Sequence, residues 1–195
     1  MKKTLLALTV CVVAACSHKT NKIATTSGTQ ESELASTNTV ANRLEVIDAN
    51  AMRIDAITTW TKTDTLELED TTESGEATYF YHNGMLEKIV ATYYGEMFQR
   101  TATYYLLDRQ LSLVISTTYH YNRPLYYDEE MMLENDDSEA FDFDKSTLVA
   151  HRSYFEDGVL IHRLSDAKDT TSTSEIDELP KIMAEFKTLT ATNNN

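Results

Sequence analysis

The sequence predicts an α+β domain in which an antiparallel β-meander of about six to seven strands carries an N-terminal helix and a C-terminal helix packed on the sheet. Three observations lead to this class. Apolar residues recur at helical spacing over residues 40–57 and again over 176–189. Between them, from about residue 76 to 164, the pattern has a period of two and is rich in Thr, Tyr, Val and Ile, which suit a pleated surface. Short turn sequences divide this middle segment into consecutive strands.

The first expected helix covers residues 40–57. Its apolar positions follow one another in steps of three and four: Val40, Leu44, Ile47, Ala51, Ile54 and Ile57. Charged and polar residues fill the other face, and Asn38 or Thr39 is a suitable N-cap. We expect this helix to lie on the sheet, with Trp60 filling the seam between them.

Two-residue turns set the strand boundaries. Asn83-Gly84 is expected to join strands over 77–82 and 85–94, because Asn-Gly is a strong hairpin signal. Asp108-Arg109 separates strands over 97–107 and 110–121, and Asp157-Gly158 separates strands over 148–156 and 159–164. Residues 125–133 are expected to form a further strand, followed by an acidic loop.

One strand indicates its buried side by alternation. In residues 110–121 one face is expected to hold Leu111, Leu113, Ile115, Tyr119 and Tyr121. The other face is expected to hold Ser112, Val114, Ser116, Thr118 and His120.

The sequence around the hairpin turns repeats weakly. Residues 79–86 (YFYHNGML) are similar to residues 154–160 (YFEDGVL), and residues 104–111 (YYLLDRQL) form a degraded copy. These segments resemble the hairpins of MORN-like repeat proteins, although the regular glycines that open each MORN unit are missing. We therefore infer a β-meander and no MORN function.

The C-terminal helix is expected over about residues 179–190. Its apolar stripe includes Ile182, Met183, Phe186 and Leu189, with Ile176 and Leu179 before it and Ser174 as a plausible cap. Pro180 suits only the first turn, so the regular helix is expected to begin near Leu179. Residues 191–195 are expected to be a frayed tail.

The tyrosines concentrate in the expected sheet. All eleven lie between Tyr79 and Tyr154, and three pairs are adjacent: Tyr93-Tyr94, Tyr104-Tyr105 and Tyr126-Tyr127. Since neighbours in a strand point to opposite faces, each pair is expected to place one ring on the side away from the helices. Such rings either stabilise the sheet or form a strip that binds sugar or protein.

Composition excludes several classes. The chain has 195 residues, 42% hydrophobic, with 31 acidic and 17 basic side chains and a net charge of −14. It is long enough for one domain with a core. A chain this acidic repels a phosphate backbone, so nucleic acid is not an expected partner.

The N-terminus indicates a lipid anchor. Lys2 and Lys3 precede an apolar run over residues 5–15, which is too short to span a membrane and is typical of a signal peptide. It ends in Val13-Ala14-Ala15-Cys16, which resembles the bacterial lipobox. The resemblance implies removal of residues 1–15, lipidation of Cys16 and attachment to a membrane. Ser17 after the cysteine accompanies outer-membrane sorting in many such proteins.

The whole plan resembles Bacteroidetes-type cell-envelope lipoproteins, a group without an assigned activity. It implies a signal peptide over 1–15, lipidated Cys16 with a disordered tether over 16–39, one α+β domain over 40–190 and a tail over 191–195. The expected location is the cell envelope, lipid-anchored, at the outer membrane and facing the periplasm or the cell surface.

The sequence offers no convincing catalytic motif, and we expect neither an enzyme nor a cofactor. His82, His120, His151 and His162 are scattered over different strands. His151 and His162 are candidates for a zinc-binding pair if they face each other across the last hairpin. The preferred interpretation is that both are half-exposed strand residues.

An acidic run is the densest charge cluster. It comprises Asp128, Glu129, Glu130, Glu134, Asp136, Asp137, Glu139, Asp142 and Asp144. Calcium prefers such oxygens, but EF-hand spacing is absent, and a solvated loop is the preferred interpretation. No metal site is therefore expected.

Two functions remain open. The first is a non-catalytic envelope lipoprotein that binds an envelope protein, glycan or lipid through its sheet face. The alternative is an acidic inhibitor or guard protein directed against a cationic envelope enzyme such as a lysozyme, which electrostatic steering would favour. The sequence does not identify the ligand-binding residues of either.

Overall fold

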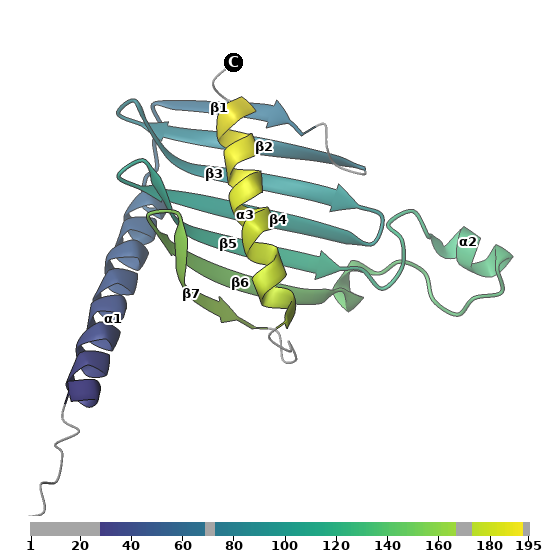
Figure 1. Ribbon diagram of the computed structural model, residues 1–195. Coiled ribbons are helices and arrows are strands. Elements are labelled where there is room, and N and C mark those ends of the chain that lie inside the picture. Colours follow the sequence, from purple (N-terminus) through teal and green to yellow (C-terminus); the bar gives the residue numbers. More distant parts are fainter. Residues whose placement is uncertain (1–27, 69–72, 167–172, 193–195) are drawn as a thin grey trace, which may run out of the picture.

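The computed structural model describes residues 28–68, 73–166 and 173–192. A long helix, α1 (Gly28–Asp55), precedes a seven-stranded sheet, and α3 (Thr173–Thr192) follows it. The strands are β1 (Lys62–Glu67), β2 (Ser74–His82), β3 (Met85–Gly95), β4 (Phe98–Leu107), β5 (Gln110–His120), β6 (Thr147–Glu156) and β7 (Val159–Ser165). Each strand pairs antiparallel with the next strand in the chain (Figure 1). The α+β meander predicted from the sequence is confirmed.

Three tight turns close the hairpins β2–β3, β4–β5 and β6–β7. Their central residues all have positive φ: Asn83 (52°), Gly84 (75°), Asp108 (52°), Arg109 (67°), Asp157 (49°) and Gly158 (77°). Positive φ at both central residues is the type I′ geometry, whose twist matches that of the flanking strands. The register then shifts at the same place in every hairpin, after Phe80, after Tyr105 and after Tyr154. The weak sequence repeat is therefore a repeated turn and β-bulge.

The bulges decide which face a side chain occupies. In β5 the shift leaves Ser112 between the paired residues Leu111 and Leu113. Leu111 consequently lies in the apolar cluster beneath α3, whereas Leu113 lies in the cluster beneath α1. The expectation that both share one face is wrong, because a one-residue bulge inverts the alternation of side chains.

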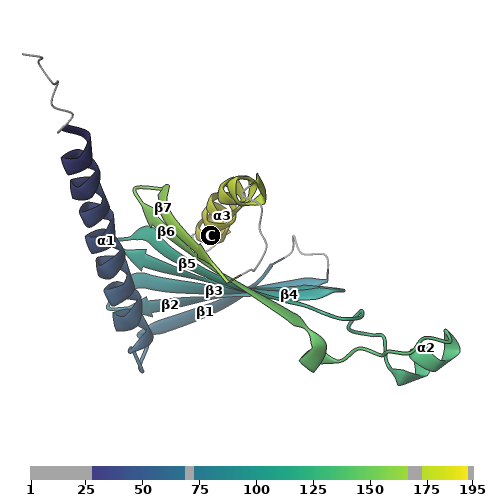
Figure 2. The ribbon, with the colours of Figure 1, turned by 90° about the horizontal axis from the view of Figure 1, so that it is seen from below.

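Helix α3 crosses one face of the sheet (Figures 1 and 2). Leu189 is buried there, its carbonyl accepts a hydrogen bond from the Tyr79 hydroxyl at 2.9 Å, and Phe186 stacks on Tyr104 with ring centroids 5.9 Å apart. The helix begins at Thr173 and continues through Pro180. The expected start near Leu179 is wrong: the helix tolerates Pro180 in its interior, although a proline there loses one backbone hydrogen bond and crowds the carbonyl four residues before it.

Helix α1 packs against the opposite face, near the hairpin turns. Ile47 and Ile54 are fully buried there in a cluster with Tyr105, Leu113 and Tyr154. The cluster is bordered by Trp60, whose ring centroid lies 5.2 Å from that of Phe80. Trp60 thus fills the seam between helix and sheet, as expected.

Equivalent aromatic residues of the three hairpins contact α1 or the segment that directly follows it. Phe80 contacts Trp60, the Tyr105 hydroxyl donates to Asp55 Oδ2 at 2.9 Å, and the Tyr154 hydroxyl donates to Asp48 Oδ1 at 3.1 Å. Each of these residues directly precedes a bulge. The repeat therefore builds a row of aromatic rings that receives the helix.

The limits of the helices differ from those expected. Helix α1 begins at Gly28, so residues 28–39, expected as part of a disordered tether, belong to the helix. Gln, Glu, Leu and Ala in this stretch are good helix formers. Helix α3 ends at Thr192, two residues into the expected tail. The predicted signal peptide, Cys16 and residues 193–195 lie outside the described residues.

Between β5 and β6 the chain forms an arm that projects beyond the sheet (Figures 1 and 2). It contains α2 (Glu129–Glu134) and a 3-10 turn (Phe143–Lys145). The strand expected over 125–133 is therefore wrong: Asp128 caps α2 by accepting from the Met131 N–H at 2.9 Å, and acidic residues in the first turn favour the helix. The seventh strand is β1, which the sequence analysis did not include.

Candidate functional site

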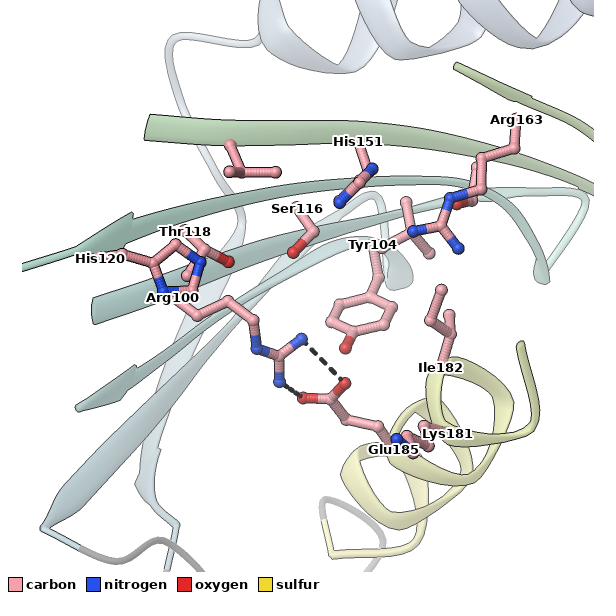
Figure 3. Close-up of a pocket in the computed structure, with 13 residues that line it drawn as sticks. Arg100, Tyr104, Ser116, Thr118, His120, His151, Arg163, Lys181, Ile182 and Glu185 are labelled. Atoms are coloured by element: carbon pink, nitrogen blue, oxygen red, sulfur yellow. Dashed lines mark hydrogen bonds and ion pairs between the residues drawn. The ribbon is translucent and has the colours of Figure 1, made fainter. Parts of the chain in front are cut away.

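A cleft of about 330 Å³ lies between α3 and the part of the sheet formed by β4 to β7 (Figure 3). Ten of the thirteen described lining residues carry a polar side chain, and the lining consists of Arg100, Tyr104, Val114, Ser116, Thr118, His120, Val149, His151, Ser153, Arg163, Lys181, Ile182 and Glu185. Its volume is near the lower end of the range of about 300–1,000 Å³ that is usual for small-molecule sites.

Strand register brings the polar residues together. Ser116 of β5 lies opposite His151 of β6, and Thr118 lies opposite Arg100 of β4. In each strand, residues two positions apart point to the same face, so the α3 face of β5 presents Val114, Ser116, Thr118 and His120 in succession. The floor of the cleft is therefore a row of hydroxyls with basic groups on either side.

The charge of the lining is opposite to that of the chain. Basic side chains are contributed by Arg100, Arg163 and Lys181, whereas Glu185 is the single carboxylate in the described lining. The whole chain has 31 acidic and 17 basic residues. The cleft is thus a local basic site on an acidic protein.

Arg100 and Glu185 form the central ion pair, which joins the sheet to α3. The guanidinium donates to both carboxylate oxygens, at 2.5 Å to Oε1 and 3.2 Å to Oε2. The Tyr93 ring lies 4.2 Å from Arg100 Cζ and supports this guanidinium from β3. The two-bond geometry neutralises Glu185 and fixes both side chains.

Tyr104 lies at the inner end of the cleft. Its side chain is fully buried, and its hydroxyl makes no hydrogen bond of ordinary geometry with any described residue. Figure 3 shows the hydroxyl directed toward the Glu185 carboxylate. Burial raises the pKa of the Tyr104 hydroxyl far above its ordinary value, and the negative charge of Glu185 raises it further. The hydroxyl is therefore a buried, protonated donor.

The histidines that the sequence singled out are divided between locations. His120 and His151 line the cleft. His162 pairs with Tyr154, and its ring packs 5.9 Å from that ring on the α1 face, whereas His151 lies on the α3 face. The two do not face each other across the hairpin, because they project from opposite faces of the sheet.

The acidic run lies in the arm. Asp137 pairs with Arg123 at 3.1 Å and Glu139 pairs with Lys145 at 2.9 Å. The Ser138 N–H and Arg123 lower the pKa of Asp137, and Lys145 lowers the pKa of Glu139. Within residues 28–68, 73–166 and 173–192, no three His, Cys, Asp or Glu side chains group as metal ligands.

The tyrosine pairs follow the alternation, but the helices lie on both faces. Tyr104 is buried beneath α3 and Tyr105 beneath α1, so neither forms an outer strip. Tyr93 supports Arg100 and Tyr94 is 36% exposed on the other face. Tyr126 and Tyr127 lie outside the strands, in the arm. The expectation of one outer ring in each pair holds only for Tyr93-Tyr94.

The structure brings together His120, His151, Ser116 and Thr118, which the sequence pattern leaves ungrouped, and it adds Arg100, Tyr104 and Glu185, which no sequence motif marks as site residues. A usable signal was present: Lys181 and Glu185 stand one helical turn apart, beside the apolar stripe of α3. Charged residues next to such an apolar stripe lie at the border of the space between the helix and the sheet that it covers.

Comparisons of the chain with protein-family models, with curated proteins and with solved structures find no match. Among the described helices, none is long and apolar enough to cross a membrane.

Proposed function

We propose that this protein is a lipid-anchored, non-catalytic binding protein of the bacterial cell envelope, and that its ligand is a glycan fragment bound on the sheet face, in the cleft beneath α3. The observation that carries the proposal is the polar cleft, in which hydroxyl, guanidinium, ammonium and imidazole groups converge. Convergent polar groups in a concave site are typical of small-ligand recognition.

The dimensions and chemistry of the cleft favour a glycan over a protein or a lipid. A volume of about 330 Å³ corresponds to about eleven water molecules at about 30 Å³ each. This space holds one or two sugar rings but no folded protein segment. An acyl chain would leave the hydroxyls of Ser116, Thr118 and Ser153 without hydrogen-bond partners, which costs free energy.

Binding without catalysis is supported by the state of Glu185. A general base or nucleophile must be available to the reacting atoms, yet both oxygens of this carboxylate accept hydrogen bonds from Arg100. The remaining lining residues offer hydrogen bonds and charge, which are sufficient for recognition.

Membrane attachment is supported by the N-terminal sequence. Two lysines, an apolar run and Cys16 stand in the order of a lipoprotein signal. Three acyl chains on Cys16 would anchor the protein stably, whereas one chain would not. The proposed location is the outer membrane, with the domain facing the periplasm or the cell surface.

Mass spectrometry of the mature N-terminus tests the anchor. We expect Cys16 to be the first residue and to carry lipid, and the Cys16→Ser variant to remain as an uncleaved precursor. An unmodified mature protein that begins at Ser17 or later would contradict the anchor.

A pair of neighbouring substitutions tests the site. Ser116→Leu would fill the cleft, whereas Thr117→Leu makes a similar change on the opposite face of β5. We expect binding of the full-length lipoprotein to envelope glycan fragments to fall at least about tenfold in the first variant and to persist in the second. Equal binding by both variants, at equal folded fraction, would exclude the cleft.

The alternative function, an acidic inhibitor of a cationic envelope enzyme, is favoured by the projecting arm. Its acidic residues lie beyond the sheet, where a partner has access (Figure 2). A pull-down from envelope extract at low and high salt distinguishes the two functions, because an electrostatic partner dissociates as salt screens the charges. Salt-sensitive retention of a lysozyme-type enzyme would support the alternative.

A further inference from the structure

We infer that the ligand of the cleft is an acidic sugar, whose carboxylate or phosphate binds at Lys181 while its hydroxyls bind along the floor of the cleft. This inference rests on the proposed function and specifies the chemical class of its ligand.

The first step is the charge balance of the cleft. Arg100 neutralises Glu185 through two hydrogen bonds, so neither contributes net charge. Lys181 adds a positive charge to the described lining, to which Arg163, His120 and His151 contribute further basic side chains. Among the described lining residues a cationic ligand would therefore find no carboxylate other than the neutralised Glu185, whereas an anionic ligand would find the Lys181 ammonium group.

The second step concerns Lys181. Its side chain lines the cleft and is exposed, and it makes no ion pair with the described residues. Two other lysines, Lys88 and Lys145, are engaged, with Asp55 at 2.8 Å and with Glu139 at 2.9 Å. An ammonium group on a rigid helix at the edge of a cleft supplies a charge-assisted hydrogen bond to an incoming anion.

The third step concerns the rest of the ligand. Ser116 and Thr118 present hydroxyls on the floor, and the buried Tyr104 hydroxyl lies at the inner end, without a hydrogen bond of ordinary geometry to a described residue. Hydroxyl groups that both donate and accept are the natural partners of sugar hydroxyls. A simple inorganic anion would leave this row unused.

The overall charge of −14 does not prevent such binding. At about 0.1 M salt the Debye length is about 10 Å, so distant surface carboxylates are largely screened. The basic groups of the cleft act at contact distance, where screening is weak.

Isothermal titration of the full-length lipoprotein in detergent micelles tests the inference. The probes are glucuronate, glucose 6-phosphate and neutral glucose, so that the first two distinguish a carboxylate from a phosphate. We expect at least one acidic sugar to bind about tenfold or more tightly than glucose.

Two lysine variants on the same helix test the role of Lys181. Lys181→Gln is expected to abolish the preference for the acidic sugar, whereas Lys187→Gln, the same change at an exposed position outside the cleft, is expected to retain it. Both positions are exposed, so thermal unfolding of both variants should match that of the unaltered protein.

The outcomes separate the two proposals. If glucose binds as tightly as the acidic sugars and Ser116→Leu removes this binding, the glycan site stands and the acidic ligand is overturned. Equal loss of the preference in Lys181→Gln and Lys187→Gln also overturns it. If none of the three sugars binds, this inference fails, and retention of glycan fragments by the Ser116→Leu variant would remove the proposed site as well.

Discussion

Tyr104 provides the sharpest test of the structure, because its buried hydroxyl makes no hydrogen bond of ordinary geometry with a described residue. Burying a hydroxyl without a hydrogen bond costs about 1–3 kcal/mol in proteins. Tyr104→Phe removes that cost and keeps the ring, which stacks on Phe186 with centroids 5.9 Å apart. We therefore expect the variant to gain about 1–3 kcal/mol in the free energy of unfolding.

The neighbouring residue is a matched control. Tyr105 is also buried, but its hydroxyl donates to Asp55 Oδ2 at 2.9 Å. A hydrogen bond to a charged group contributes about 1.5–3 kcal/mol, and the 51% exposure of the Asp55 side chain lets water replace part of it. Tyr105→Phe is therefore expected to lose about 1 kcal/mol.

Thermal unfolding followed by circular dichroism measures both changes. For a domain of this size, about 1 kcal/mol shifts the melting temperature by about 2–4 °C, so the opposite signs are resolvable. If Tyr104→Phe is destabilised as much as Tyr105→Phe, the Tyr104 hydroxyl has a partner in the free protein. The Tyr104 hydroxyl would then not be an open donor for a ligand.

Three further predictions concern stability. The pKa values of Tyr93, Tyr104 and Tyr105 are raised, first by burial and then by nearby carboxylates, so their stabilising contribution is complete below pH 10 and is lost as pH rises above it. The free energy of unfolding should therefore fall above pH 10. Absorbance at 295 nm should show that these three tyrosines ionise only as the fold is lost. Ionisation of all eleven near pH 10 in a folded protein would contradict this. Lys88→Met should lower the free energy of unfolding in urea by about 1–2 kcal/mol, because Lys88 Nζ lies 5.3–5.9 Å from the ring centroids of three aromatic residues and pairs with Asp55 at 2.8 Å. An unchanged urea midpoint would show that these contacts of Lys88 do not stabilise the fold. EDTA should leave the melting temperature unchanged, and a fall of more than a few degrees would indicate a bound cation in the acidic arm.

Local sequence determined the elements of this fold well. Asn83-Gly84, Asp108-Arg109 and Asp157-Gly158 adopt positive φ, for which Asn, Asp and Gly have an intrinsic preference, so the three turns are where the sequence indicates. The apolar stripe through Ile47, Ala51 and Ile54 faces the sheet because helical periodicity leaves only one apolar face to bury. Consecutive short connections then favour pairing between neighbouring strands.

The arm shows where local pattern misleads. Residues 125–133 carry apolar side chains at spacings compatible with a strand. Asp128 and the acidic residues after it nevertheless stabilise the N-terminus of the short helix α2. Outside the sheet no neighbouring strand offers backbone partners, so the capping interaction decides the conformation.

The turns, the two amphipathic helices and the order of the meander follow from the sequence, because each depends on residues close together in the chain. The faces of the sheet and the cleft depend on long-range packing. A single bulged residue, Ser112, moves Leu111 and Leu113 to opposite faces, and such a shift is set by pairing with the neighbouring strand. Arg100 meets Glu185 across 85 positions only because α3 crosses the sheet at that point. Side-chain alternation predicts the neighbours within one strand, whereas a site shared by four strands and a helix depends on how these elements pack.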